Sequence, residues 1–305
     1  MNLTLDLFKQ MLADNQKHRI ILDTDAYNEV DDQFCIAYCM KAKEKIELLS
    51  INAAPFLNER SVSPADGMQK SYDEIFKVMK LVDPNASIPV YRGSESFLLS
   101  ETEPVESDAA NNIVNTVMGS EEPVIIVAIG AITNVASAII KCPEIAKRAA
   151  VVWLGGNALH YWHNSEFNFR QDVFAARVVF NSNIPLLQVP CAGVCTEFRT
   201  TVPELKEHLL GANALCDYLF SNVEEECRIS ATRGNAAPSR IIWDVTAAAA
   251  LICPRACSMV TIPRPLISSD GLYSTDLSRP HYVYVRSLDR DRIYGDLFEK
   301  LTRKD

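Results

Sequence analysis

Short continuous runs of aliphatic and β-branched residues recur along the first two thirds of the chain. Such runs are typical of parallel strands that are covered on both faces of a sheet. We predict buried strands at residues 19–22, 46–53, 123–129, 149–154 and 184–189.

Amphipathic or alanine-rich segments with the periodicity of helices alternate with these runs, at residues 32–43, 67–82, 133–141, 173–180 and 245–252. The alternation predicts an α/β fold with an open, mainly parallel central sheet, flanked by helices, and a Rossmann-like core. No repeat or Pro/Gly-rich linker divides the sequence, so we expect residues 1–305 to form a single domain. Ligands of such folds bind beyond the carboxyl ends of the strands.

The composition, 48% hydrophobic and 23% charged over 305 residues, is that of a soluble globular protein. A net charge of -9 argues against nucleic acid as a partner, because phosphate backbones attract basic surfaces. The chain contains neither an apolar run long enough to span a membrane nor a signal-peptide pattern, so we expect a cytoplasmic protein without a membrane partner. Nine cysteines without a dense framework are expected to be reduced thiols.

Acidic residues are concentrated directly after the first predicted strand. The segment from Asp23 to Asp32 reads DTDAYNEVDD, with five carboxylates and no lysine or arginine. Carboxylates packed this tightly repel one another unless a hard divalent cation, such as calcium or magnesium, takes their oxygens as ligands. The alternative is a helix start with Asp31 and Asp32 as first-turn acids, which leaves Asp23 and Asp25 unexplained.

The acidic segment resembles the D-x-D-P-G-x-D-D motif that opens the inosine-uridine preferring nucleoside hydrolases. Here it is two residues longer, and Ala26-Tyr27 replaces Pro-Gly. Three further landmarks of the family recur in order: VAIGAITNVA at 127–136, a G-G…E-F-N…D block over 155–172, and Trp243-Asp244 ahead of an alanine-rich helix. The resemblance covers most of the chain and implies the nucleoside hydrolase fold.

The resemblance implies a calcium ion held by side chains and one backbone group. Its ligands would be Asp25, bidentate Asp32, Asp244 and a backbone carbonyl, which by position is that of Val127. Asp25 would also be the catalytic general base that takes a proton from the attacking water.

The resemblance also implies the substrate contacts. Asp31 and Asn168 would hydrogen-bond the sugar hydroxyls, and Glu166 would take the 5′ hydroxyl. Trp243 stands where the family often has a histidine, and it resembles the purine-specific branch, in which an indole stacks on the base. The alternative for Trp243 is a core aromatic residue ahead of a buried helix.

Residues 157–165, NALHYWHNS, depart from the family, which usually supplies an asparagine to the 5′ hydroxyl there. Ungapped counting back from Glu166 puts His160 in its place. We predict that His160 or His163 acts as the catalytic proton donor to the leaving group, and that Asn157 contacts the substrate. The alternative is an ordinary surface loop.

Two further segments carry weaker predictions. Residues 50–58 stand where the family has a T-T-V-x-G-N turn, and Asn58 is predicted to contact the ribose after a one-residue shift. Pro55 and Asn58 are equally typical of a simple turn. The polar stretch 227–239 is predicted to be a mobile loop that closes over the base.

These features together predict a calcium-dependent hydrolase that cuts the N-glycosidic bond of ribonucleosides, with a leaning toward purines, to give base and ribose. A carboxylate-rich pocket complements the positive charge that develops on the ribose. The resemblance implies a homodimer or homotetramer.

Three alternatives remain from the sequence. The same site could serve another riboside, such as a modified nucleoside or nicotinamide riboside, or the chain could be a non-catalytic nucleoside-binding protein. A magnesium-dependent phosphate-transferring enzyme is disfavoured because no lysine or arginine accompanies the acids to bind phosphate.

Overall fold

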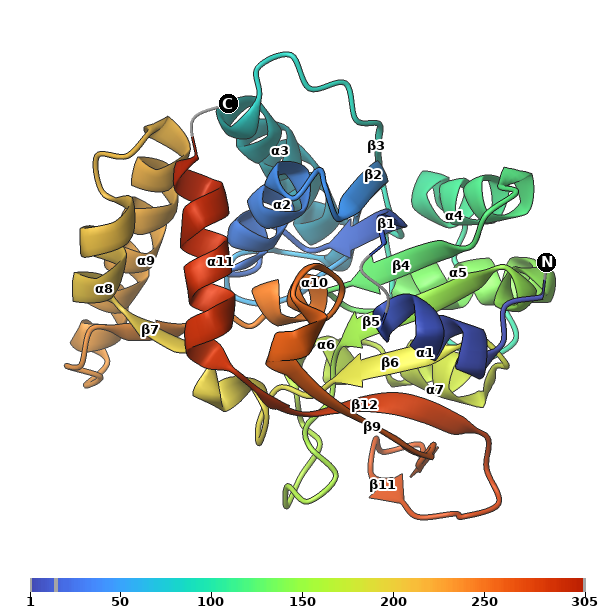
Figure 1. Cartoon of the computed structure of the whole chain (residues 1–305). Coiled ribbons are helices and arrows are strands. Elements are labelled where there is room, and N and C mark those ends of the chain that lie inside the picture. The colour runs from blue at the N-terminus through green and yellow to red at the C-terminus, as the bar shows by residue number, and fades with distance from the viewer. Residues whose placement is uncertain (1, 14–15, 304–305) are drawn as a thin grey trace.

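The computed structural model describes residues 2–13 and 16–303, and its centre is an eight-stranded sheet (Figure 1). The strand order is β3-β2-β1-β4-β5-β6-β12-β9. Neighbours from β3 to β12 pair in parallel, and β9 is antiparallel to β12 at the edge. The strands are β1 (His18–Thr24), β2 (Ile46–Ala53), β3 (Val90–Tyr91), β4 (Val124–Ala128), β5 (Ala149–Leu154), β6 (Leu186–Val189), β9 (Cys257–Pro263) and β12 (His281–Leu288). The predicted open, mainly parallel sheet is confirmed.

Helices cover both faces of this sheet (Figure 1). The layer on one face contains α1 (Leu5–Ala13), α2 (Asp32–Lys41), α3 (Pro64–Val82), α10 (Val245–Ile252) and α11 (Arg290–Thr302). Outside this layer, α8 (Val202–Leu209) packs against α11, and α9 (Ala214–Thr232) packs against α3 and α11. The layer on the opposite face contains α4 (Asp108–Gly119), α5 (Thr133–Lys141), α6 (Phe167–Gln171) and α7 (Val173–Asn181). Two small sheets pair β7 (Arg199–Thr201) with β8 (Ser239–Ile241) and β10 (Leu266–Ile267) with β11 (Tyr273–Ser274). Short 3₁₀ helices lie at Pro143–Lys147, Cys195–Glu197 and Pro254–Ala256.

The two faces of the sheet bury two separate apolar layers. Along β1, Ile20 and Leu22 belong to the layer of α2, α3 and α10, whereas Ile21 belongs to the layer of α4, α5 and α7. Successive side chains of a strand point to opposite faces. Because helices cover both faces, every central position of the strand is apolar, which explains the continuous runs in the sequence.

The five predicted strands and five predicted helices are all present, with ends within three residues of the predicted ones. The mobile loop predicted at 227–239 is wrong in its first part, because α9 continues to Thr232. The buried residues Leu215, Leu219, Val223 and Cys227 recur every four positions on one face of α9, and their packing keeps the segment helical.

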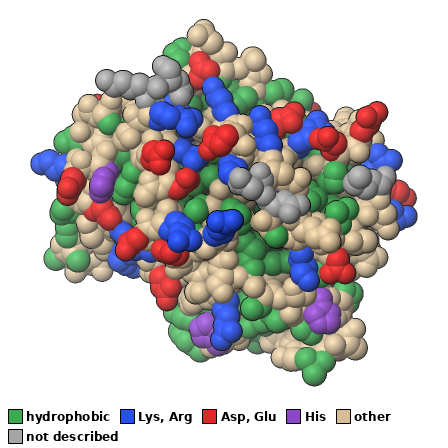
Figure 2. Space-filling view, viewed as in Figure 1, with side chains coloured by type: hydrophobic (Ala, Val, Ile, Leu, Met, Phe, Trp, Pro, Cys, Tyr) green, Lys and Arg blue, Asp and Glu red, His purple; other side chains and the backbone are tan. Residues whose placement is uncertain are grey.

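Several broad expectations can be compared with the described residues. No helix among them is long and apolar enough to cross a membrane. All nine cysteines are free, as predicted. On the face seen in Figure 2, acidic and basic side chains are interspersed, and the described residues form no continuous basic patch there.

The strand order reverses direction between β1 and β4, which lie side by side at the centre of the sheet. The chain leaves β1 toward β2 and β3 on one side, and then returns to β4, β5 and β6 on the other. In open α/β sheets, the loops beyond such a switch point diverge and leave room for a ligand.

Candidate active site

A cavity of about 290 Å³ lies beyond the carboxyl ends of β1, β4, β5 and β6. It is built from the loops that follow these strands, together with the turn ahead of α10. Among the residues lining its walls are Asn28, Glu29, Asp31, Ile129, Asn157, Tyr161, His163, Glu166, Asn168, Cys191, Trp243 and Asp244. The described lining residues include four carboxylates and no lysine or arginine, so the cavity favours positive charge.

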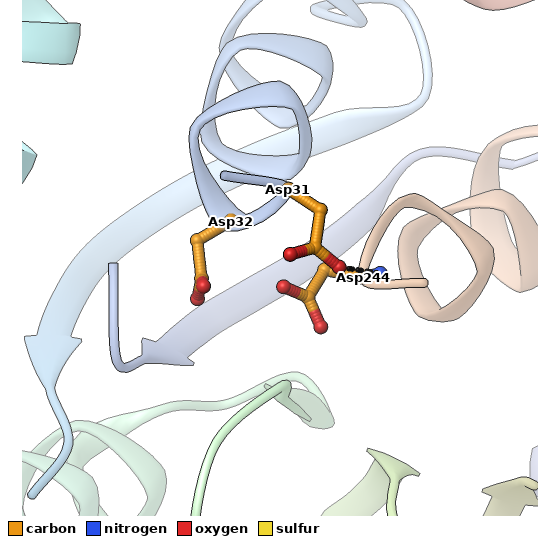
Figure 3. A group of neighbouring side chains, drawn as sticks. All are labelled: Asp31, Asp32 and Asp244. Carbon is orange, nitrogen blue, oxygen red and sulfur yellow. Dashed lines mark hydrogen bonds between the residues drawn. The ribbon is translucent and has the colours of Figure 1, made fainter. Parts of the chain in front are cut away.

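Three buried carboxylates form a group of which two, Asp31 and Asp244, line the cavity, whereas Asp32 and the nearby Asp25 lie behind its wall. Asp31 and Asp32 come from the start of α2, and Asp244 directly precedes α10. Figure 3 shows the three side chains directed toward a common point, and each offers an oxygen within 4.8 Å of the others. The backbone N–H of Asp244 donates to Asp31 Oδ2 at 3.3 Å, which ties the two segments together.

Asp25 is a fourth buried carboxylate, in the turn after β1, and only 1% of its surface is exposed. Neither Oδ1 nor Oδ2 has a hydrogen-bond partner among the described residues. Burial, and then the negative charges of Asp32 and Asp31, raise the pKa of Asp25 well above its usual value. Gly130 lies against it, since a Cβ at Gly130 would be 2.9 Å from Asp25 Cγ.

The arrangement of these four carboxylates fits a hard divalent cation. Buried carboxylate oxygens without partners are costly, and a cation that takes them as ligands removes that cost. Asp32 accepts a hydrogen bond from Thr24 Oγ1, which orients its carboxylate. The ligand atoms that Asp31, Asp32 and Asp244 offer, and the two unpartnered atoms of Asp25, are oxygens of the kind that calcium and magnesium prefer.

Val127, whose backbone carbonyl is predicted to complete this set, does not line the cavity. Val127 lies inside β4, in register with Leu22 of β1 and Val152 of β5, where strand backbone groups are used by the sheet. The residue that leaves the sheet and lines the cavity is Ile129. The carbonyl of Ile129 is therefore better placed than that of Val127 to face the cavity, and the neighbouring Gly130 lies against Asp25.

A pH dependence of stability follows from the crowded carboxylates. Burial above all raises the pKa of Asp32 to about 8, and raises those of Asp25 and Asp244 well above their usual values. In the unfolded chain these pKa values are about 4. Between the two limits the folded protein holds more protons, so its free energy of unfolding falls as pH rises from about 4 to 8. We expect that bound calcium removes this decrease in the free energy of unfolding, because the cation neutralises the ionised carboxylates.

The measurement is thermal unfolding at pH 5, 6.5 and 8, in chelator and in calcium. At each pH the quantity compared is the melting temperature in calcium minus that in chelator, because titrating groups outside the carboxylate cluster affect both melting temperatures equally. We expect the stabilisation by calcium to grow with pH. Equal melting temperatures with and without calcium at every pH would contradict a cation site built from these carboxylates.

Glu166 organises the backbone on the opposite side of the cavity. Its Oε2 accepts from the N–H groups of Gly156 at 2.8 Å and Phe169 at 2.9 Å, and its Oε1 accepts from the N–H of Asn168 at 2.9 Å. Asn168 Nδ2 donates to the carbonyls of Ile129 and Leu154, both at 3.0 Å. These bonds leave Asn168 Oδ1 to accept from a ligand. The 5′-hydroxyl contact predicted for Glu166 stays a prediction.

Asn157 and His163 are brought together at the cavity, but His160 is not. Asn157 Nδ2 donates to the carbonyl of His163 at 3.1 Å, and its Oδ1 accepts from the N–H of Ala192 at 3.0 Å. His163 Nδ1 accepts from the N–H of Ser165 at 3.0 Å, so the neutral ring carries its proton on Nε2. His160 is exposed and does not line the cavity. The prediction of His160 as a proton donor is therefore not supported, whereas His163 remains a candidate.

Asn58 does not line the cavity, contrary to the ribose contact predicted for it. Its Nδ2 donates to Asn28 Oδ1 at 2.6 Å, and its Oδ1 accepts from the N–H of Arg60 at 2.8 Å. Asn58 thus supports the loop between β1 and α2, and Asn28 of that loop lines the cavity where Asn58 was predicted to do so. Asn28 and Glu29 were not predicted as cavity residues, although the two extra residues between Asp25 and Asp31 indicate that this wall differs from the family motif.

Trp243 lies in the cavity wall, beside Asp244. The guanidinium carbon of Arg240 is 5.0 Å from the centroid of the Trp243 ring. Arg240 Nη2 is also paired with Glu29 Oε2. This ion pair connects the loop between β1 and α2 with strand β8, which ends shortly before Trp243. Asp31, Asp244 and Trp243 therefore lie along one continuous wall.

Comparison with known proteins connects this geometry to a family. The model of the inosine-uridine preferring nucleoside hydrolases matches residues 20–294. The non-specific ribonucleoside hydrolase RihC of Klebsiella pneumoniae is 27% identical, over 77% of this chain and 79% of the relative. The pyrimidine-specific ribonucleoside hydrolase RihB of Escherichia coli is 27% identical, over 68% of this chain and 70% of the relative.

Solved structures share the fold at lower identity. The purine-preferring ribonucleoside hydrolase from Gardnerella vaginalis aligns with a TM-score of 0.76 at 19% identity, covering 93% of this chain and 98% of that one. The relatives' names span purine-preferring, pyrimidine-specific and non-specific proteins. The base preference of this chain therefore depends on the residues of its own cavity.

Proposed function

Because the chain belongs to the inosine-uridine preferring nucleoside hydrolase family, we propose that it cleaves ribonucleosides with a calcium ion and a preference for purines. Family membership makes it an enzyme that hydrolyses the N-glycosidic bond of ribonucleosides. The calcium ion and the purine preference are the proposal. The observation that carries it is Asp25, a buried carboxylate with neither oxygen partnered among the described residues, behind a group of three further carboxylates, of which Asp31 and Asp244 line the cavity.

The residues that would hold the ion are Asp25, Asp32, Asp244 and the backbone carbonyl of Ile129. Calcium is favoured over magnesium because it accepts more oxygen ligands, including bidentate carboxylates and backbone carbonyls. When bound, the ion supplies Lewis acidity that makes water a better nucleophile at neutral pH.

The chain's own residues account for the rest of the reaction. Asp25 accepts the proton of the attacking water, and its unpartnered oxygens make it the available base. Asp31 and Asn168 Oδ1 accept hydrogen bonds from the ribose hydroxyls, which orients the anomeric carbon. The surrounding carboxylates stabilise the positive charge that develops on the ribose as the bond to the base breaks.

The leaning toward purines rests on Trp243. An indole in the cavity wall offers a flat surface on which a purine stacks with more contact than a pyrimidine. His163, with its proton on Nε2, is the histidine at the cavity that could donate to a leaving base.

The proposal includes the domain organisation, the oligomeric state and the location of the protein. We propose that residues 1–305 act as one domain, in a cytoplasmic homodimer or homotetramer, as the family resemblance implies. Gel filtration with light scattering measures the oligomer directly.

A panel of nucleosides tests the substrate preference. We expect kcat/KM for inosine and guanosine to exceed that for uridine and cytidine by about tenfold, because stacking contributes roughly 1 kcal/mol. We expect 2′-deoxyinosine to be at least about a hundredfold poorer than inosine, because buried acceptors lose their hydroxyl partner. Ribose release is measured as reducing sugar. A pyrimidine preference would refute the role of Trp243, and a best substrate such as nicotinamide riboside would replace the purine proposal.

A further inference from the structure

The loop that brings His163 to the cavity, residues 157–165, is attached to a distant part of the chain. That part is residues 264–280, which lie between β9 and β12 and contain β10 and β11; we call it the β10–β11 segment. Asn164 makes the connection. Its Nδ2 donates to the backbone carbonyl of Gly271 at 3.1 Å, and its Oδ1 accepts from the backbone N–H of Asn157 at 2.7 Å. Asn164 is buried but does not line the cavity, so it can affect a ligand only through other residues.

The backbone just ahead of Asn157 is fixed by the same segment. Gly156 has a φ of 73°, and a Cβ there would lie 2.1 Å from Tyr273 Oη. Gln188 Nε2 donates to Tyr273 Oη at 2.9 Å and to the carbonyl of Gly155 at 2.8 Å. The position of Asn157 therefore depends on β6, which carries Gln188, and on the β10–β11 segment.

Asn157 in turn determines the hydrogen bonds of the His163 ring. Its Nδ2 donates to the carbonyl of His163 at 3.1 Å and lies 3.4 Å from His163 Nδ1. The backbone N–H of Ser165 donates to the same Nδ1 at 3.0 Å. A ring nitrogen that faces two donors is the one without hydrogen, so the hydrogen of the neutral ring is on Nε2.

We propose that Asn164 is a positioning residue, which clamps Asn157 to the β10–β11 segment and thereby holds His163 as an Nε2–H hydrogen-bond donor to the bound ribonucleoside. This inference rests on the proposed function, because it requires a ribonucleoside in the cavity that His163 lines. Without the clamp, Asn157 Nδ2 is no longer held beside Nδ1, and the hydrogen can lie on either ring nitrogen. A ring with its hydrogen on Nδ1 offers the ligand an acceptor at Nε2 instead of a donor.

The first test determines the position of the His163 hydrogen without any turnover. In the full chain with isotope-labelled histidine, the nitrogen chemical shifts distinguish a ring nitrogen that carries hydrogen from one that does not. The chain has only five histidines, so the signals of His163 are identified by their loss in His163→Ala. We expect the Nε2–H tautomer alone in the wild type and a mixture of both tautomers in Asn164→Ala. The Nε2–H tautomer alone in both proteins would overturn the proposal.

The second test asks whether Asn164 acts on the substrate through His163. We expect Asn164→Ala to lower kcat/KM for inosine in calcium about tenfold, the effect of losing one hydrogen bond. In the His163→Ala background, the same substitution should change kcat/KM by less than about twofold, because the group that Asn164 positions is then absent. An equal loss in both backgrounds would show a general structural role and contradict the proposal.

Arg279→Gln is the matched control within the β10–β11 segment. Arg279 Nη2 donates to the carbonyl of Phe180 and to Asn181 Oδ1, both at 2.8 Å, which ties the segment to the end of α7. Its substitution removes none of the bonds to residues 157–165 described above. We expect lower stability, with the His163 tautomer and kcat/KM for inosine unchanged. A tautomer mixture like that of Asn164→Ala would show that the segment as a whole, and not Asn164, sets the ring, which overturns the proposal.

Asn164→Asp is the second variant, should Asn164→Ala not fold. It keeps an acceptor for the N–H of Asn157 but loses the donor to the carbonyl of Gly271. A mixture of His163 tautomers is again expected, and the Nε2–H tautomer alone would overturn the proposal.

The two tests separate this inference from the proposed function. If the wild type releases no ribose from inosine in calcium, the proposed function fails, whereas the nitrogen shifts still decide whether Asn164 sets the hydrogen of His163. If the wild type hydrolyses inosine and Asn164→Ala behaves like the wild type, only the inference about Asn164 is overturned.

Discussion

Asp25→Asn is expected to lower kcat for a purine riboside by at least about a thousandfold, because it removes the proton acceptor for the attacking water and a ligand oxygen of the ion. The change is close to isosteric. Asp25 is fully enclosed, and neither of its oxygens has a partner among the described residues. The loss should therefore appear in kcat rather than in folding.

The stability of this variant carries a second, opposite expectation. In chelator, Asp25→Asn should melt at or above the wild-type temperature, because it removes one of several mutually repelling buried charges. Asp172→Asn is the contrasting control. Asp172 accepts from Thr133 Oγ1 at 2.8 Å and from the N–H of Leu98 and of Ala175, both at 2.9 Å, so its replacement should lower stability and preserve kcat. Retention of more than a tenth of wild-type kcat in Asp25→Asn would contradict its role as the base.

Removal of the metal is expected to have an effect of similar size. In chelator, kcat should fall at least about a thousandfold, and added calcium should restore it, because the charges of Asp25, Asp31, Asp32 and Asp244 then lack a counter-ion. At a calcium concentration about a thousand times the dissociation constant, binding should add about 4 kcal/mol to the free energy of unfolding.

The recovery of turnover and the increase in stability should depend on calcium concentration in the same way, because one bound ion causes both. Turnover and melting temperature are measured across a calcium titration of protein freed of metal, and the two midpoints are expected to coincide after correction for temperature. Magnesium should restore less activity, since it requires a stricter octahedral geometry. Full activity in chelator would contradict the proposed cofactor.

Much of the fold could be predicted because both faces of the sheet are covered. The strands at 46–53 and 149–154 coincide with β2 and β5, since a run without polar positions is needed wherever helices pack on both sides. The end of α9 was missed because the polar residues on its exposed face obscured the apolar spacing that ends at Cys227.

Site residues that are adjacent in the sequence could be predicted from it. Site residues whose position depends on contacts between separate loops were predicted less well. Asp31 and Asp32 begin α2 as expected, and the meeting with Asp244 follows from strand order. The predicted carbonyl, that of Val127, lies inside β4, and the sequence does not mark that this strand ends at Ala128, one residue before Ile129 reaches the cavity. The choice between His160 and His163 depends on tertiary hydrogen bonds that spacing alone does not encode.

The most direct test of the central claim is the stoichiometry of products from inosine, with protein freed of metal and then given calcium in phosphate-free buffer. We predict equal amounts of ribose and hypoxanthine, with release beginning only when calcium is added. Release of neither product, or release at the same rate in chelator, would contradict calcium-dependent hydrolysis by this chain.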